Sequence, residues 1–448
     1  MILLKLMQAV ARRRSTLKLS REARERRNLE RFRELAAFVQ QSSPWYRQVM
    51  ETHGIDPLTC VPADFPVLTT AMIREHFDDI VTDRSITLVG MKAFVEQFPS
   101  PKSLFLGRYH VVSSSGSTGL PAYYIHTTDE LVNGMAYGIF HRRLKPRTRT
   151  SFIGILGEHK MSTAVMGLMD RWPENLLFNT CNFDVRAPWG QTIAGLNQHR
   201  PQVISAYKHV LIRLAEEARA GQLMIDPILL ESGGEPLFRH EREFLRSTFK
   251  CEIANSYGSS EVNLMGVALN DWEGIYLFED DLMFEVEDNF TCVTNLYNRV
   301  LPLIRYKFDD ILSPLEVEKP RLPFRVVSET IGRSQELISF STGDGDDRKF
   351  KIMIFEDVEF SGLRRVEFEK RGAATLAVGV EFIRSAGPDD EVGKSDRDTR
   401  RERLRLALRQ HLDAHELQGV RLEVYSIELS NDAVDDGRKE KLVLSPSR

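Results

Sequence analysis

Cysteine is scarce in this sequence, and it is never arranged in a pattern that holds a metal or a disulfide framework. The four cysteines among 448 residues lie far apart, and none belongs to a C-x-x-C pair: Cys60, Cys181, Cys251 and Cys292. Such spacing is typical of thiols in a reducing compartment. We therefore expect a cytoplasmic protein without a zinc or disulfide scaffold.

Long apolar runs and an excess of basic charge are also missing. No stretch approaches the roughly 18 uninterrupted apolar residues that a membrane-spanning helix needs. The 60 Lys and Arg residues stand against 64 Asp and Glu, a net charge of −4 that offers no global basic field for nucleic acid. Since 42% of the residues are apolar and 28% are charged, the chain has the composition of a globular protein. We expect no membrane span and no nucleic-acid partner.

Basic charge is nevertheless concentrated near the N-terminus. Residues 11–33 contain ten Lys and Arg but only three Asp and Glu. Because this charge follows the first apolar residues instead of preceding them, an N-terminal helix is indicated rather than a secretory signal. A basic helical stripe usually faces solvent and sometimes binds an acidic partner. We expect the solvent-facing arrangement, with membrane-surface or nucleic-acid binding as weaker alternatives.

Apolar spacing predicts a chain of alternating helices and short strands. Helical periods fall at 21–41, 69–77, 210–220 and 237–249, and strand-like runs at 109–112, 122–126, 151–156 and 225–230. Alternation of this kind favours an α/β domain with substantially parallel strands.

The pattern changes near residue 332. A Gly- and Asp-rich run precedes a strand at 375–383, a helix at 400–411 and a strand at 421–429. This succession is typical of a compact α+β unit. We predict a large domain over residues 1–332, with a helical segment at 1–80, and a small domain over residues 333–448.

The clearest local motif is a Ser- and Gly-rich run between two strand-like segments. It reads Ser113-Ser114-Ser115-Gly116-Ser117-Thr118-Gly119-Leu120-Pro121. Small residues let backbone N–H groups approach a phosphate, and the hydroxyl groups add donors. A flexible linker has a similar composition, but linkers usually join domains rather than neighbouring strands. The G-x-x-x-x-G-K-[ST] spacing of a P-loop is absent.

Two further loops follow strand-like runs, where α/β sheets place their ligand-binding loops. They are Ser232-Gly233-Gly234-Glu235-Pro236 and Asn255-Ser256-Tyr257-Gly258-Ser259-Ser260-Glu261. A tyrosine ring can stack on a purine, and a carboxylate can bind Mg²⁺ through oxygen. Taken alone, the second loop is equally well explained as an ordinary turn with a half-buried tyrosine.

In this order along the chain, the motifs resemble those of adenylate-forming enzymes of the acyl-CoA synthetase superfamily, in particular the phenylacetate–CoA ligase-like branch and its capsule-biosynthesis relatives. Residues 114–121 resemble the family's S-S-G-T-T-G-x-P loop, 232–236 its G-x-E-P segment, and 257–261 its Y-G-x-S-E motif. Residues 304–311 resemble I-R-Y-R-x-x-D-L, and 332–334 the start of the hinge. The resemblance implies an α/β fold: a large multi-sheet N-terminal domain and a small, mobile α+β lid.

The resemblance also implies an activity. ATP and a carboxylic acid, an aryl or small organic acid, would give an acyl-adenylate and pyrophosphate, and a thiol would then take the acyl group. Coenzyme A is the expected acceptor, and a carrier-protein thiol or an amine is the alternative. A nucleotide-binding homologue with impaired catalysis is the other alternative. Neither the acid nor the oligomeric state follows from the sequence, although a homodimer is the commonest assembly.

Single residues take roles by the same resemblance. Contacts with the ATP phosphates are expected from Ser114, Ser115, Gly116, Ser117, Thr118 and Gly119. Contacts with the nucleoside and its metal are expected from Tyr257 stacked on adenine, Gly234 and Glu235 beside the base, the turn with Gly258 and Ser260, Glu261 on Mg²⁺, Asp310 on the ribose hydroxyls, and Arg333 next to them. For Asp310 a turn cap is the alternative, and for Arg333 a surface ion pair. Thr118 and Glu261 are the expected catalytic residues of the large domain.

A C-terminal lysine is the remaining catalytic candidate, because the family moves such a lysine into the site with the small domain. The family pattern is G-K-x-x-x-[VF]-[IV], and this chain reads Asp436-Gly437-Arg438-Lys439-Glu440-Lys441-Leu442-Val443. Lys439 fits if one residue is inserted, Lys441 is the second choice, and a solvated basic tail is the third. A flexible point charge suits carboxylate and phosphate oxygens, and we expect Lys439 to supply it.

A polar segment at Gly157-Glu158-His159-Lys160 interrupts a region that the family often lines with small or apolar residues. His159 or Lys160 could face a polar acid substrate. A lone His beside a Lys is more often part of a surface loop, and we expect a surface loop here.

Overall fold

The computed structural model groups the chain into two compact units. Unit 1 comprises Met1–Thr150, Ile155–Asn182 and Ser256–Ser328, and unit 2 comprises Ser151–Gly154, Phe183–Asn255 and Glu329–Arg448. The domain boundary expected after residue 332 stays a prediction. The structure describes residues 2–97, 102–114, 122–142, 145, 147–169, 179–235, 237–269, 273–287, 290–328, 332–333, 337–341, 347–351, 355, 358, 363–371, 374–382, 391–415, 417–427 and 443–444.

Unit 1 begins with helices whose ends are set by local sequence. Ser20, Ser43 and Thr69 cap three of them, each accepting a hydrogen bond from the backbone N–H three residues on. The helices predicted at 21–41 and 69–77 are confirmed. The helices are α1 (Ile2–Thr16), α2 (Arg21–Ser42), α3 (Pro44–His53), α4 (Thr70–Ile80) and α5 (Leu88–Gln97).

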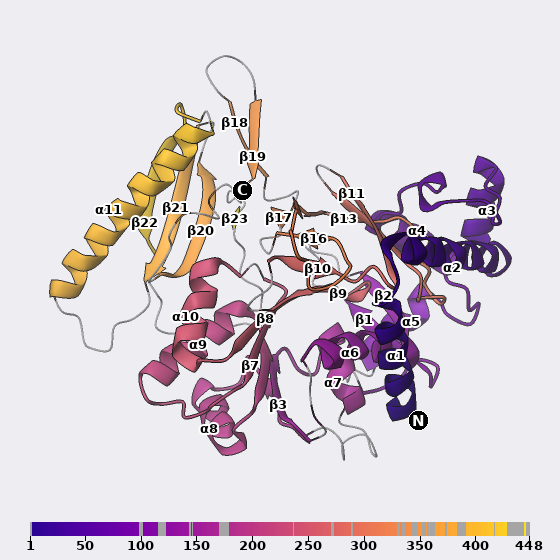
Figure 1. The fold of residues 1–448 in the computed structure, drawn as a ribbon, viewed down its shortest axis with the longest axis horizontal. Coiled ribbons are helices and arrows are strands. Elements are labelled where there is room, and N and C mark those ends of the chain that lie inside the picture. Colours follow the sequence, from indigo (N-terminus) through magenta and orange to yellow (C-terminus); the bar gives the residue numbers. More distant parts are fainter. Residues whose placement is uncertain are drawn as a thin grey trace. The chain divides into compact units, whose positions relative to one another are not determined.

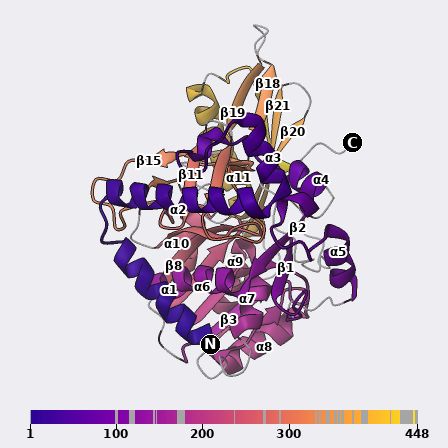
Figure 2. The same cartoon turned by 90° about the vertical axis from the view of Figure 1, so that its right-hand side faces the viewer.

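A β-hairpin carries the Ser- and Gly-rich run. Strands β1 (Tyr109–Ser113) and β2 (Tyr123–Thr127) pair antiparallel with Ser113 opposite Tyr123, and Ser114 lies beside Ala122, the residue just after the run. Helices α6 (Thr128–Arg142) and α7 (Met161–Met169) follow. Helix α1 packs along α6 (Figures 1 and 2), and both contribute to one buried apolar cluster with α7 and β1.

The remaining strands of unit 1 pair mostly antiparallel, in contrast to the expected parallel pattern. One path runs β15–β16–β10–β9, and another runs β11–β12–β13. Their bounds are β9 (Asn263–Ala268), β10 (Ile275–Leu277), β11 (Leu282–Val286), β12 (Thr291–Asn295), β13 (Tyr306–Phe308), β15 (Pro314–Leu315) and β16 (Val326–Val327), and short strands β4 (Asn179–Thr180) and β14 (Asp310–Ile311) complete the set. The chain passes from unit 2 into unit 1 along β8 (Glu252–Ser259).

Unit 2 contains the parallel pairs that the sequence predicts. Strands β6 and β7 pair parallel, as do β3 and β5. The strand expected at 225–230 begins only at Leu229, because Pro227 lacks a backbone N–H for a ladder. The elements are β3 (Arg149–Gly154), β5 (Phe183–Asp184), α8 (Trp189–His199), β6 (Val203–Ala206), α9 (Lys208–Arg219), β7 (Leu229–Gly233) and α10 (Arg239–Phe249).

The C-terminal part of unit 2 is the α+β arrangement that was predicted. Four strands take the order β22–β21–β20–β23, and helix α11 packs leucines against them, Leu408 and Leu412 among them (Figure 1). The helix begins at Glu391, ahead of the expected residue 400. The elements are β17 (Gly332–Arg333), β18 (Leu337–Ser341), β19 (Asp347–Lys351), β20 (Leu363–Arg371), β21 (Thr375–Phe382), α11 (Glu391–Ala414), β22 (Arg421–Ser426) and β23 (Val443–Leu444).

Only part of the basic stripe at residues 11–33 faces solvent as expected, at Arg14, Lys18, Arg21 and Arg26. Arg13 is 1% exposed, and its guanidinium donates to Asp280 at 2.7 Å and to Asn133 Oδ1 at 2.7 Å. Arg31 donates to Asp281 at 2.6 Å. Opposite charges within the same chain therefore hold α1 and α2 against the turn before β11, so the expectation of a solvated face is right for part of the stripe and wrong for Arg13 and Arg31.

None of the helices in the described part of the chain combines the length and apolar character that crossing a membrane requires. The cysteines that the structure describes are all free thiols, and three of the four are buried.

Candidate active site

Two motifs that lie about fifty residues apart in sequence are joined by a hydrogen bond in unit 1. Tyr257, in β8, donates its hydroxyl proton to Asp310 Oδ2 at 2.9 Å. The Tyr257 ring is 7% exposed. The Asp310 backbone carbonyl also accepts from Thr291 Oγ1 at 3.0 Å. Asp310 is therefore fixed by its neighbours on β8 and β12, and Tyr257 has a role in holding it.

Steric crowding explains why the same motif has a glycine at position 258. A Cβ atom at Gly258 would lie 2.7 Å from the Asn263 carbonyl oxygen, closer than a real Cβ contact allows. Asn263 itself has a φ of +71°, in the left-handed region that asparagine tolerates better than most residues. The turn between β8 and β9 is thus tightly folded, and it brings Glu261 to its tip.

The Glu261 carboxylate lies beside two buried tyrosines. Tyr306, in β13, donates to Glu261 Oε1 at 3.4 Å, and its hydroxyl lies 3.0 Å from that of Tyr124 in β2. Thr70 Oγ1, at the start of α4, is 2.8 Å from the Tyr306 hydroxyl. Burial, and next the negative charge of Glu261, raises the pKa of both tyrosines, so both hydroxyls keep their protons at neutral pH.

A histidine from the same hairpin holds the residue before Glu261. His126 Nε2 is 3.0 Å from the Ser260 carbonyl oxygen, and since a carbonyl only accepts, this nitrogen carries a proton. His126 Nδ1 lies 3.4 Å from the Glu130 carboxylate, whose pKa is raised by burial. Strand β2 therefore bonds the tyrosine–glutamate turn through His126, and it bonds Tyr306 beside that turn through Tyr124.

Hydrogen bonds join the start of the Ser- and Gly-rich run to the residue that follows its end. Ser114 N–H donates to the Ala122 carbonyl at 2.9 Å, and Ala122 N–H donates to Ser114 Oγ at 3.2 Å. Ser113 donates its N–H to the His159 carbonyl at 2.6 Å. His159 is 3% exposed and its Nδ1 donates to the Val111 carbonyl, so this residue supports β1 from inside, while Gly157 in the same segment is exposed as a surface loop predicts.

The loop after β7 belongs to unit 2. Gly234 has a φ of +79°, which favours glycine. The Glu235 carboxylate is buried and accepts from the backbone N–H of His209 at 3.2 Å and from its Nδ1 at 2.8 Å. Glu235 therefore caps the start of α9. The position of this loop beside the adenine base stays a prediction.

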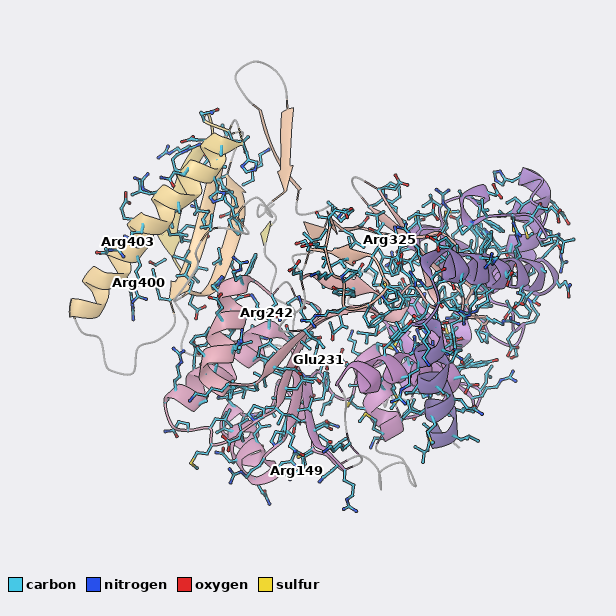
Figure 3. The ribbon with its side chains drawn as sticks, viewed as in Figure 1. Arg149, Glu231, Arg242, Arg325, Arg400 and Arg403 are labelled. Carbon is cyan, nitrogen blue, oxygen red and sulfur yellow. The ribbon has the colours of Figure 1, made fainter. Side chains whose placement is uncertain are left out.

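Other charged groups near this loop have structural partners. Glu231 and Arg242, labelled in Figure 3, bind Ser205 Oγ and the Ile253 carbonyl, respectively. Lys208, which is buried, forms an ion pair with Glu241 at 2.9 Å.

Several predicted site residues lie outside the described residues or are described only by their backbone. Arg333 belongs to β17, and nothing is described of its side chain. Outside the described residues lie Ser115, Gly116, Ser117, Thr118, Gly119, Lys439 and Lys441. Their roles stay predictions.

Sequence reasoning missed the residues that support the motifs. Tyr124, His126 and Thr70 stand outside every motif, and each makes a hydrogen bond to a motif residue. The available signal was the composition of β2, where Tyr-Tyr-Ile-His is too polar for a simple apolar strand. Buried polar groups need partners, so such a strand indicates a hydrogen-bond network.

Comparisons with known proteins give relatives but no match to any family model. Protein CapK of Staphylococcus aureus is 23% identical over 313 residues, which are 65% of this chain and 63% of that protein. Phenylacetate-coenzyme A ligase of Thermus thermophilus is 25% identical over 318 residues, which are 63% of this chain and 64% of that protein. The alignments thus span less than two thirds of these relatives' own lengths.

Solved structures extend the comparison over nearly the whole chain. A 2-hydroxyisobutyryl-CoA ligase in the postadenylation state, in complex with 2-HIB-AMP, has a TM-score of 0.72 at 16% identity, covering 95% of this chain and 90% of that one. The same ligase with 2-HIB-AMP and CoA has a TM-score of 0.58 at 18% identity over the same shares. The expected fold class is confirmed. The curated relatives confirm the resemblance to adenylate-forming enzymes of the phenylacetate–CoA ligase-like branch.

Proposed function

We propose that this protein is an AMP-forming ligase that activates a carboxylic acid with ATP and transfers the acyl group to a thiol. One observation carries the proposal. The turn 257–261 and the segment 304–310 are joined by two hydrogen bonds, Tyr257 to Asp310 and Tyr306 to Glu261. The hairpin that bears the Ser- and Gly-rich run bonds the same turn through His126 and the segment through Tyr124, whose hydroxyl lies beside that of Tyr306.

The first step brings like charges together. A carboxylate oxygen of the acid attacks the α-phosphorus of ATP, the bond to the β-phosphate oxygen breaks, and pyrophosphate leaves. Donors fixed in advance offset the repulsion among these anions. In the proposal the backbone and hydroxyl groups of residues 114–119, Thr118 among them, donate to the phosphates, and Asp310 accepts from the ribose hydroxyls. Tyr257 faces the adenine, with Gly234 and Glu235 beside the base and Arg333 near the ribose.

The residues at the turn fit a magnesium ion. Mg²⁺ prefers oxygen ligands and is usually held by one or two carboxylates together with substrate phosphates. Glu261 is such a carboxylate, and the groups around it are hydroxyls. In the described part of the chain, no cluster of three or more His, Cys, Asp and Glu forms a protein-only metal cage. When bound, the ion would neutralise charge on the leaving pyrophosphate.

The second step transfers the acyl group. A thiolate attacks the acyl carbonyl carbon, and AMP leaves with the bonding electrons. We propose coenzyme A as the thiol, because both ligases named above carry it in their names. Lys439 would stabilise the carboxylate and α-phosphate oxygens during the first step. A small organic or aryl acid, a cytoplasmic location and a homodimer complete the proposal.

Pyrophosphate exchange tests the activity. The protein is incubated with ATP, Mg²⁺, labelled pyrophosphate and a panel of aryl, alkyl and hydroxy acids. At least one acid should support exchange, and Glu261→Gln and Asp310→Asn should each lower it. Addition of coenzyme A should then give the acyl thioester, whereas a carrier protein or an amine as the only productive acceptor would correct that part. ATP binding without exchange for any acid would favour the impaired homologue.

A further inference from the structure

Three hydroxyl groups form a cluster that ends on one carboxylate oxygen of Glu261. Tyr306 contacts Glu261 Oε1 at 3.4 Å, and the hydroxyls of Thr70 and Tyr124 lie 2.8 and 3.0 Å from that of Tyr306. Tyr124 is 1% exposed and Tyr306 is 2% exposed. This cluster lies entirely within unit 1.

The Tyr306 side chain is fixed from several directions. Leu68, next to the start of α4, pairs with the backbone around it: Leu68 N–H donates to Arg305 and Lys307 N–H donates to Leu68, at 3.0 and 2.9 Å. The Tyr306 ring also packs edge-on against Phe308, with ring centres 5.0 Å apart. The backbone pairing fixes the main chain at Tyr306, and the ring packing restricts the side chain.

The number of hydroxyl protons determines which group donates in each hydrogen bond of the cluster. Tyr306 has one hydroxyl proton, and a carboxylate can only accept, so that proton goes to Glu261. The lone pairs of Tyr306 then accept from Thr70 and Tyr124. Such a chain of donors strengthens the last bond, the one to the charged oxygen.

We propose that Tyr306 is a positioning residue that orients Glu261 toward the cation accompanying the nucleotide, with Thr70 and Tyr124 holding Tyr306 in place. With Oε1 held by Tyr306, Oε2 would coordinate the cation in a fixed orientation. Residues that hold a metal ligand in this way are commonly worth a further gain in metal affinity. The inference rests on the proposed function.

Binding of Mn²⁺ tests it without catalysis. Free Mn²⁺ is measured by electron paramagnetic resonance while the protein is titrated with Mn²⁺ and ATP in the absence of any acid. Tyr306→Phe should raise the Kd of Mn²⁺ by about 10- to 100-fold. Thr70→Val should raise it less, and Thr70→Ser, which keeps the hydroxyl, should stay near the wild type.

Tyr276→Phe is the matched control. Tyr276 is also fully buried, and its hydroxyl accepts from the Arg321 N–H at 3.0 Å, with no bond to Glu261. Its loss should leave the Kd of Mn²⁺ unchanged. Melting temperatures of all variants show whether each is folded.

The outcomes separate the inference from the function. If the wild type binds Mn²⁺ with ATP and Tyr306→Phe binds it equally well, the inference is overturned and the function stands. If the wild type neither binds Mn²⁺ nor exchanges pyrophosphate, both are overturned. If Tyr306→Phe does not fold, the Thr70 pair decides, and equal affinities for Thr70→Val and Thr70→Ser overturn the inference.

Discussion

Replacement of Arg13 by methionine should destabilise unit 1 strongly. The guanidinium is 1% exposed and lies 2.7 Å from Asp280 Oδ2 and 3.2 Å from Asp281 Oδ2. Asp281 keeps Arg31 in the variant, at 2.6 Å. Asp280 loses its 2.7 Å partner, and burial already raises the pKa of this carboxyl. Asp280 is therefore the carboxylate that loses most of its electrostatic stabilisation in the variant.

The expected magnitude follows from this burial. Removing one partner of a buried ion pair usually costs about 3–5 kcal/mol, because the other charge stays buried without compensation. Replacing both partners removes that penalty. We therefore expect Arg13→Met to cost about 3–5 kcal/mol, and Arg13→Met/Asp280→Asn to cost at least about 2 kcal/mol less than the single variant.

Urea unfolding followed by circular dichroism measures both values. Arg21→Met is the control, since Arg21 and Glu25 form an ion pair on α2 whose side chains are 70% and 62% exposed. Such an exposed pair should contribute less than about 1 kcal/mol. The loss in Arg13→Met should also persist in high salt, because a buried pair is screened little. A cost below about 1 kcal/mol, or a double variant no more stable than the single one, would refute the reasoning.

Three further predictions concern other parts of the chain. Burial lowers the pKa of His240 to about 4 from 6.5, so the unfolded state binds its proton first and stability falls as the pH drops from 6.5 to 4. The loss should reach at most about 3 kcal/mol, and His240→Gln should flatten it in urea titrations at several pH values. Lys439→Ala should slow pyrophosphate exchange by about 100-fold or more while Lys441→Ala does not, and the reverse result would move the assignment to Lys441. Gly274 has a φ of +84°, and a Cβ atom there would lie 2.4 Å from the Val327 backbone carbonyl oxygen, so Gly274→Ala should cost about 1–3 kcal/mol, visible as a lower Tm, and an unchanged Tm would contradict this packing.

Helices could be predicted where local information suffices. The helix at α9 follows from apolar residues at helical spacing, which are buried in the structure, and α4 follows from its Thr69 cap. The strand at 225–230 was placed too early because apolar character alone does not show burial. Ile228 is 55% exposed, whereas Leu229 and Leu230 are buried. Proline at position 227 was the local signal against an earlier start.

The basic N-terminal stripe shows where local information fails. Arg13 and Arg31 look like part of a solvated face because their partners, Asp280 and Asp281, lie about 250 or more residues away in sequence. Nothing in the spacing of the arginines identifies an acidic pair in the same chain. The same limit applies to Glu261, whose position in a motif was predictable but whose contact with Tyr306 was not.

The N-terminal helical segment is therefore part of the proposed site and not an appendage to it. Tyr46, on α3, donates to the Pro302 carbonyl at 2.8 Å and accepts from the Ile304 N–H at 3.2 Å, directly before the segment that contains Tyr306. Leu68 and Thr70 then reach Tyr306 itself through backbone and hydroxyl groups. Since these bonds come from α3 and the start of α4, local unfolding of these helices would release the hydroxyl that orients Glu261. Stability in the first eighty residues and cation binding at Glu261 are thus linked through one chain of contacts.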